Sequence, residues 1–313
     1  MILVCGEALL DLFVDAEGHG HLALDGRPGG SPFNVAFGLA RLGQKAEFLA
    51  GLSTDLVGKR LYRFLKDEGV GETFLHRSSR PSTLSLVDLT DKTAPAYAFY
   101  GEGAADRDLN ESDIPPLPDA IEALHFGSFS TVVEPVGSTL EALARRESGR
   151  RLISYDPNIR MTIEPDIAVW HGKVAALASV AHLVKISDED FERLHGDADP
   201  EAVARQWLAG PATRLVVLTR GGKGARAWTR EHALDLPAPA IAVVDTVGAG
   251  DTFQAALLTA LAETGHLSPQ ALGTIQLPAL HACIAFAIQA AALTCSRRGA
   301  DLPRRAELPP LHS

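Results

Sequence analysis

The stretch of sequence that decides the fold is VVDTVGAGDTFQAALL, from Val243 to Leu258. Its two leading valines suit the end of a strand, and Thr252 to Leu258 suit a helix. Backbone amides at the small residues between them would point at an anion at the positive end of that helix. These small residues are Gly248, Ala249 and Gly250. The pattern predicts an anion site beside Asp251, although aspartate there is also a common helix cap.

Short apolar runs alternate with longer helical patterns on the N-terminal side of this stretch. Strands are predicted at Ile2–Cys5, Leu152–Ser154, Leu183–Ile186 and Leu215–Leu218, and helices at Val35–Leu42, Gly137–Arg146 and Glu201–Leu208. This alternation is typical of an α/β fold with a mostly parallel sheet. Residues 12–24 and 84–101 instead form extended segments without helices, so we expect one α/β domain over residues 1–313 with a small inserted β lid.

Composition and charge exclude several classes of partner. A net charge of −10 argues against nucleic acid or an anionic membrane, which need clustered Lys and Arg. The three cysteines, Cys5, Cys283 and Cys295, have no spacing that suggests disulfides or zinc. No basic n-region precedes the first apolar run, and the apolar segment Ala282–Leu293 is too short to span a membrane. We expect a cytoplasmic enzyme with small-molecule substrates.

A second glycine-rich stretch, GRPGGSPFNVAFGLARLG, runs from Gly26 to Gly43. Gly29 and Gly30 suit a tight turn, and Ser31 is expected to cap the helix that follows. Asn34 offers both a donor and an acceptor in the first turn, which suits the hydroxyls of a polyol. Alone, the stretch would be an ordinary loop and helix start.

A third stretch, VVLTRGGKGAR, runs from Val216 to Arg226. A strand ends before Thr219, and three glycines then let a turn pass close to phosphates or ribose. These glycines are Gly221, Gly222 and Gly224. Alone, the string would be a β-turn with a basic tip.

Together, in this order, the first two stretches resemble the signature motifs of the PfkB, or ribokinase-like, carbohydrate kinase family. The third stretch also matches, as do Gly6-Glu7 with Asp11, DPNIR at Asp156–Arg160 and KISDED at Lys185–Asp190. The resemblance covers nearly the whole chain. It implies a three-layer ribokinase-like sandwich with a β lid, and transfer of a phosphoryl group from ATP to a sugar hydroxyl.

The resemblance also implies roles for individual residues. Asp251 is the general base, the amides of residues 248–250 form the anion hole, and Arg160 touches sugar or γ-phosphate unless it is a surface cation. The expected sugar ligands are Asp11, Gly29, Gly30, Asn34, Tyr100, Asp106, Arg160 and Asp251. The expected ATP contacts are Lys185, Ser187, Thr219, Gly221, Gly222, Gly224, Gly248 and Gly250.

Metal ions are implied by ATP and by the family. Mg²⁺ usually keeps water and phosphate ligands and takes only one or two carboxylates. The family's N-x-x-E motif is here Ser187 to Asp190, so Asp190 is expected to act through water. The family further suggests a monovalent cation, K⁺, near Asp245, Val247 and Gly299, and a homodimer formed through the lids.

The substrate is expected to be a neutral ketohexose. YAFYGEGAADRDL, at Tyr97–Leu109, resembles bacterial fructokinases, although its aromatic residues also suit a lid core. In 2-keto-3-deoxygluconate kinases an arginine follows the lid aromatics, whereas this chain has Gly101, so that activity is the alternative. Ribose and adenosine kinases resemble the chain less, and Ile288 leaves the nucleotide preference open.

Two further alternatives belong to other classes. A non-catalytic sugar sensor on the same fold could lose the base, whereas this chain keeps Asp251. Neither G-x-G-x-x-G after the first strand nor G-x-x-x-x-G-K-[ST] occurs, which argues against a nicotinamide dehydrogenase and a P-loop kinase.

Overall fold

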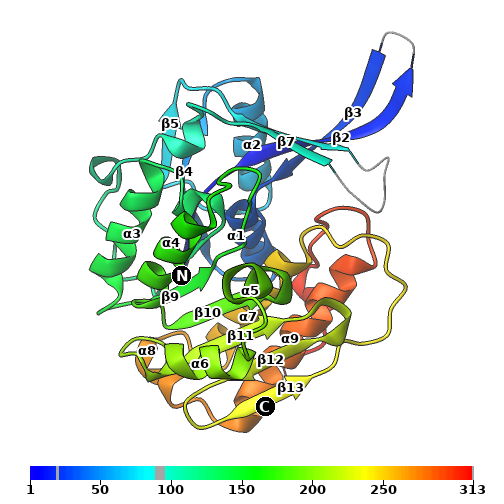
Figure 1. Ribbon diagram of the computed structural model, residues 1–313. Helices are drawn as coiled ribbons and strands as arrows, with labels where there is room; N and C mark the ends of the chain where they lie inside the picture. The colour runs from blue at the N-terminus through cyan, green and yellow to red at the C-terminus, as the bar shows by residue number, and fades with distance from the viewer. Residues whose placement is uncertain (19–20, 89–95, 312–313) are drawn as a thin grey trace.

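Nine strands form the central sheet of the computed structural model, which describes residues 1–18, 21–88 and 96–311 (Figure 1). Their order is β13-β12-β11-β10-β9-β8-β1-β4-β5, parallel from β11 to β5, with β12 and β13 added antiparallel at one edge. The strands are β1 (Ile2–Cys5), β4 (Ala46–Ser53), β5 (Leu75–Ser78), β8 (Ala123–Gly127), β9 (Leu152–Asp156), β10 (Leu183–Ser187), β11 (Leu215–Thr219), β12 (Ala225–Trp228) and β13 (Ala233–Leu236). The parallel strands therefore share one carboxyl edge, where ligands bind in open α/β sheets.

Helices cover both faces of this sheet, as the apolar runs require. One face carries α1 (Ser31–Arg41), α2 (Leu56–Asp67), α7 (Ala249–Glu263), α8 (Pro269–Gly273) and α9 (Leu277–Cys295). The other carries α3 (Val136–Glu147), α4 (Ile167–Ala178), α5 (Asp188–His195) and α6 (Pro200–Ala209). In β1, Ile2 and Val4 enter the first core and Leu3 and Cys5 enter the second. A strand buried on both faces reads as a continuous apolar run, so the predicted three-layer fold is confirmed.

The two extended segments join in a separate four-stranded sheet. Its strands are β2 (Leu9–Gly18), β3 (His21–Gly29), β6 (Thr83–Asp88) and β7 (Ala96–Tyr100), in the order β3-β2-β6-β7. Figure 1 shows the β2–β3 hairpin projecting from the body of the protein. The predicted lid segments also include residues 19–20 and 89–95, which lie outside the described part of the chain.

The expected strand at Val243 and Val244 is wrong. These valines are 63% and 62% exposed, in a loop that leads from β13 into α7. The amide of Val244 donates to the carbonyl of Cys295 at 2.8 Å rather than to a strand. The chain must return here from the edge of the sheet to α7, so its β-branched residues cross as a loop.

Helix α9 is longer than the apolar segment Ala282–Leu293 that we judged too short for a membrane. Among the described residues it is the helix whose length and composition would allow a membrane span. Half of that window is buried, and α9 packs against α7 in the first core. The same composition therefore suits the core helix of a folded domain.

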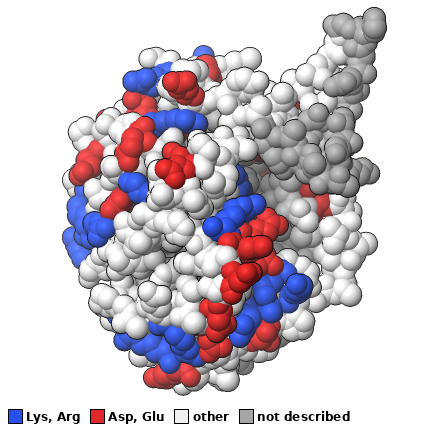
Figure 2. Space-filling model, in the orientation of Figure 1, with Lys and Arg blue, Asp and Glu red and all other residues white. Residues whose placement is uncertain are grey.

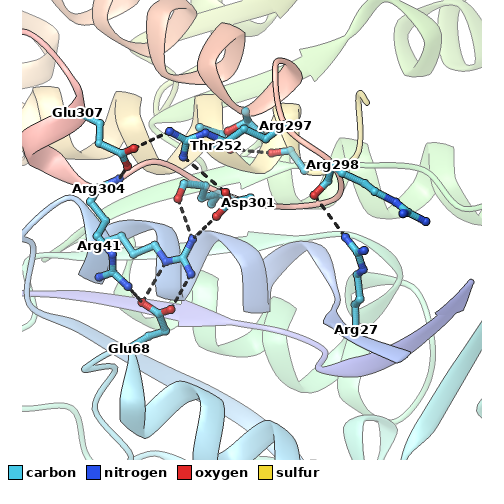
Figure 3. A network of polar contacts seen from close by, with 12 residues as sticks. Arg27, Arg41, Glu68, Thr252, Arg297, Arg298, Asp301, Arg304 and Glu307 are labelled. Atoms are coloured by element: carbon cyan, nitrogen blue, oxygen red, sulfur yellow. Dashed lines mark hydrogen bonds and ion pairs between the residues drawn. The ribbon is translucent and has the colours of Figure 1, made fainter. Parts of the chain in front are cut away.

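The chain after α9 is tied to α1 and α2 by charged contacts (Figure 3). The guanidinium of Arg41 donates to Glu68 at 2.6 Å and to the carbonyl of Leu302 at 2.7 Å, and Arg304 also reaches Glu68, at 3.1 Å. The Leu302 side chain is 1% exposed, because it fills the space left beside Gly38. This segment is therefore anchored to the body of the domain.

Candidate active site

A cavity of about 690 Å³ opens at the carboxyl edge of the parallel strands, between the central sheet and the four-stranded sheet. The predicted site residues on its wall are Asp11, Gly30, Asn34, Arg160, Lys185, Ser187, Asp190, Thr219, Gly221, Val247, Gly248, Gly250 and Asp251. The other predicted site residues do not line the cavity, as far as the structure describes its wall: Gly29, Tyr100, Asp106, Gly222, Gly224, Asp245, Ala249 and Gly299. Segments far apart in the sequence thus meet at one cavity.

Asp251 lies in the first turn of α7, on the cavity wall. Its Oδ1 accepts a hydrogen bond from the Ser31 hydroxyl at 2.6 Å, and its Oδ2 accepts one from Asn34 Nδ2 at 2.8 Å. The helix cap is Gly248, so Asp251 is not the cap. Two donors from α1 therefore hold the carboxylate in one orientation.

Ser31 has a different role from the expected one. The N-cap of α1 is Gly30, and Ser31 is the first helical residue, whose hydroxyl binds Asp251. Gly30 has φ 105°, and a Cβ there would lie 2.8 Å from the carbonyl oxygen of Glu7. The turn thus requires glycine at residue 30. The helix therefore begins at Ser31, one residue earlier than a Ser31 cap would place it.

The N-terminus of α7 leaves room for a ligand beside Asp251. Gly248 has φ 77°, and a Cβ on Gly250 would lie 3.2 Å from Lys185 Nζ. The amide of Ala249, by contrast, donates to the carbonyl of Thr246 at 3.2 Å, and Ala249 is not on the described wall. The predicted anion hole would therefore use the amides of residues 248 and 250 rather than all three.

Lys185 is held in an ion pair beneath this helix end. Its Nζ lies 2.7 Å from Asp156 Oδ2, and the two side chains are 4% and 3% exposed. Burial raises the pKa of Asp156, an effect that the Lys185 ammonium opposes. The pair joins β9 to β10 and places a positive charge beside Gly250.

Asp11 and Arg160 both line the cavity. Burial raises the pKa of Asp11 to about 6, while a hydrogen bond with Ser85 and the charge of Arg160 lower it and the charge of Asp251 raises it. The guanidinium of Arg160 donates to the carbonyl of Ile159 at 3.0 Å. Lid and body therefore contribute opposite charges to the same space.

Tyr100 and Asp106 do not line the described cavity. The Tyr100 side chain is 63% exposed at the end of β7, whereas its neighbour Phe99 lines the cavity. Asp106, in the short helix η1 (Ala105–Arg107), is buried and accepts a hydrogen bond from the Thr83 hydroxyl at 2.7 Å. Because strand residues alternate between faces, the sequence could not tell which aromatic points inward.

Two of the three glycines after β11 lie off the described wall. A Cβ on Gly224, whose φ is 86°, would lie 2.0 Å from the carbonyl oxygen of Leu236. Gly221, with φ 50°, does line the cavity, as does Thr219. Gly222 lies in a short 3₁₀ helix, η4 (Gly221–Lys223), and Gly224 ends it before β12 begins.

The acidic start of α5 is partly committed to protein contacts. Ser187 is the N-cap and accepts a hydrogen bond from the amide of Asp190 at 3.1 Å. Asp190 is 4% exposed, and its Oδ1 accepts a hydrogen bond from Arg193 at 3.0 Å. Among the described residues no group of three or more His, Cys, Asp or Glu forms a metal cage. These residues suit a water-mediated contact to a phosphate-bound Mg²⁺ better than direct ligation.

The three residues expected near a monovalent cation lie together, with Val247 on the cavity wall. Asp245 Oδ1 accepts a hydrogen bond from the amide of Val247 at 3.0 Å, and its Oδ2 accepts one from the amide of Gly299 at 2.7 Å. The carboxylate thereby pins the loop before α7 to the chain after α9.

Several wall residues have no role in the prediction from sequence, and Glu7 and Ser85 are two of them. Glu7 was noticed only as part of the Gly6-Glu7 match, and Ser85 was not noticed. Glu7 is 1% exposed and Ser85 is also 1% exposed. An acidic residue just past the end of an apolar strand was the available signal for Glu7, whereas a serine in β6 offers none.

Comparisons with known proteins agree with this geometry. The family model for the pfkB family carbohydrate kinases matches residues 1–306. A fructokinase of Rhizobium leguminosarum bv. trifolii is 39% identical over 280 residues, which cover 90% of this chain and 85% of that protein. The crystal structure of a Xylella fastidiosa fructokinase with bound ATP is similar, with a TM-score of 0.89, 26% identity, and coverage of 98% of this chain and 96% of that one. A Vibrio cholerae fructokinase bound to fructose, ADP and calcium has a TM-score of 0.82 and 27% identity, with the same coverage. The chain belongs to the pfkB family of carbohydrate kinases.

Proposed function

We propose that this protein is a fructokinase, which transfers the terminal phosphoryl group of ATP to a hydroxyl of fructose or a closely related neutral ketohexose. The observation that carries the proposal is the carboxylate of Asp251, which lies on the cavity wall with both oxygens held by Ser31 and Asn34. A general base must be oriented toward the acceptor hydroxyl, and these two donors supply that orientation. The similarity to the Rhizobium fructokinase supports the choice of sugar.

In the proposed reaction, Asp251 accepts the proton of the attacking sugar hydroxyl. The sugar oxygen bonds to the terminal phosphorus of ATP, and ADP leaves. The amides of Gly248 and Gly250, at the positive end of α7, stabilise the charge on the transferred group. Arg160, on the same cavity wall, adds a positive charge near the same oxygens. Magnesium bound with ATP would neutralise further phosphate charge, and Asp190 is the carboxylate expected to face it through water.

The charges on the wall favour a neutral sugar. No side chain projects from Gly101, and Arg107 Nη2 fills the neighbouring space from outside the described wall. The described cations on the wall are Arg160, Lys185 and Arg193, of which the last two are already paired with acids. A carboxylated sugar would thus have only Arg160 to pair with, among the described residues.

The surface charges support small-molecule substrates. Figure 2 shows acidic and basic side chains interspersed over the visible face, and the chain carries a net charge of −10. A nucleic-acid surface would instead need clustered positive charge.

The test is ADP release over a panel of fructose, other ketoses, ribose, adenosine and 2-keto-3-deoxygluconate. We expect fructose to have the highest kcat/KM. A clear preference for 2-keto-3-deoxygluconate would make the chain an acidic-sugar kinase instead. Binding of a sugar without ADP release from any of them would favour a sensor.

Asp251→Asn tests the role of the base. Loss of general-base catalysis should lower kcat about 10²–10⁴-fold, while the shift in Tm on adding fructose is retained. The matched control is Asp119→Asn, because the Asp119 side chain is 92% exposed in a surface ion pair. Unchanged turnover in Asp251→Asn would refute the mechanism.

A further inference from the structure

Glu7 is a buried carboxyl on the cavity wall that the proposed reaction does not use. It lies two residues after the end of β1 and is 1% exposed. Gly6 has φ 154°, and a Cβ there would lie 2.3 Å from Pro32 and 2.8 Å from the Ser130 hydroxyl. The backbone before Glu7 is therefore packed too tightly to turn the side chain elsewhere.

One oxygen of this carboxyl lacks a partner. The Ser130 hydroxyl donates to the carbonyl of Gly127 at 2.9 Å, and Glu7 Oε2 has no hydrogen-bond partner among the described residues. A buried polar atom without a partner costs free energy, so such atoms in native proteins usually meet a ligand or water. Since Glu7 lines the cavity, a ligand in the cavity is the available partner.

The charges around Glu7 come from several elements. Asp106, from η1, is the described acid that acts on Glu7 most directly, and Arg107 follows it in the same helix. Asp11 from β2 and Asp251 from α7 share the cavity, as does Arg160 from the loop after β9. The described cavity wall thus carries six acids and three cations, with Asp188, Glu189 and Asp190 of α5 and the paired Lys185 and Arg193 completing the set.

We propose that Glu7 is a specificity residue, whose Oε2 hydrogen-bonds a hydroxyl of a neutral polyol and disfavours a sugar that carries a carboxylate. This inference rests on the proposed sugar kinase function and names the substrate class that the site selects. A hydroxyl can pair with a carboxylic acid as acceptor or with a carboxylate as donor. A substrate carboxylate, in contrast, is repelled by ionised Glu7.

This difference predicts a pH dependence of the selection. Burial raises the pKa of Glu7 to about 7. Below that pH the side chain is mostly neutral, and above it the charge repels an anionic sugar. The ratio of kcat/KM for fructose to that for 2-keto-3-deoxygluconate should therefore rise as pH increases through 7. Asp11 and Asp106 titrate at about 6, and both remain in a Glu7 variant, so the difference between wild type and variant isolates Glu7.

The experiment compares Glu7→Gln and Glu7→Ala with wild type from pH 6 to 8.5. In Glu7→Ala the lost hydrogen bond should raise KM for fructose about 10-fold, with a smaller change in kcat. Glu7→Gln keeps a hydrogen-bonding group, so KM for fructose should stay within about 3-fold. In that variant the selection against 2-keto-3-deoxygluconate should fall about 10-fold at pH 8 and lose its rise through pH 7.

The control is Glu147→Gln, at a buried glutamate that ends α3, pairs with Arg151 just before β9, and does not line the cavity. It should lower Tm without changing sugar selection. An unchanged selection ratio and pH profile in Glu7→Gln would overturn the inference, even if Glu7→Ala fails to fold. If wild type phosphorylates no sugar at all, the proposed function fails instead. Glu7 is then judged by whether Glu7→Gln alters the sugar-induced shift in Tm, and an unaltered shift also overturns the inference.

Discussion

Gly29 has no side chain, and this leaves room for the carboxylate of Asp11 on the neighbouring strand β2. A Cβ on Gly29 would lie 2.1 Å from Asp11 Oδ2, closer than any real contact. Gly29 is off the described wall, so it acts by leaving space for Asp11, which is on the wall. Gly29 was predicted to bind the sugar; its surroundings indicate instead that it positions Asp11.

Gly29→Ala should therefore turn the Asp11 carboxylate away from the sugar. We expect KM for the sugar to rise about 10-fold, because a buried hydrogen-bonding partner is lost, with kcat less affected. Steady-state kinetics with fructose measures this. The control Gly172→Ala, at a helical position with nothing within 4 Å of the added Cβ, should leave KM unchanged. A KM equal to that of wild type in both variants would contradict this account.

At the scale of elements, β9, β10 and α7 meet at the Lys185–Asp156 pair. The pair spans two adjacent parallel strands, and its ammonium lies beside the first turn of α7. The strand pattern predicts neighbours in the sheet, whereas only the register brings these two side chains to 2.7 Å. The same contact supports both the sheet and the candidate anion hole.

Lys185→Met tests this contact, since it leaves Asp156 buried without its partner. Breaking a buried pair should lower the free energy of unfolding by about 3–5 kcal/mol, measured by urea denaturation at pH 8. Burial already raises the pKa of Asp156, so protonation at pH 5 should make the loss smaller. Arg145→Met, which removes an exposed pair with Glu141, should cost about 0–1 kcal/mol. The role of the buried pair would be contradicted if both variants lost the same free energy of unfolding, or if Lys185→Met lost more at pH 5 than at pH 8.

At the scale of the whole molecule, the four-stranded sheet presents an open edge. Its edge strand β3 carries Leu22 and Leu24, which are 47% and 41% exposed. An apolar edge strand is a ready site for pairing with another chain. Two copies that join their lids through this edge would cover the leucines in a two-fold interface.

The mass in solution tests this arrangement. Light scattering of wild type should give about twice the 33.2 kDa of one chain, and Leu22→Asp with Leu24→Asp should give a single chain. Tm measured on the same samples separates loss of the dimer from loss of the fold. A wild type that remains a single chain at all concentrations rules out the lid dimer.

The positions of the strands and helices followed from local pattern. Apolar runs such as Ile2–Cys5 predicted strands buried on both faces, and the period of Val35–Leu42 predicted a helix. Local pattern misled at Val243 and Val244, because strand propensity says nothing about whether a neighbouring strand is within reach. It also missed the true start of α1, which depends on the approach of Gly30 to Glu7.

The sequence by itself determined the α/β class, the lid segments, and the motifs that place Asp251 at the start of a helix. Only the tertiary structure decided which side chains meet there: Ser31 and Asn34 on Asp251, Lys185 on Asp156, and Glu7 with one oxygen unpaired. The physical reason is the distance along the chain over which each effect acts. Propensity and periodicity act over a few residues, whereas a hydrogen bond between α1 and α7 joins positions more than 200 apart and exists only after the sheet has brought them together.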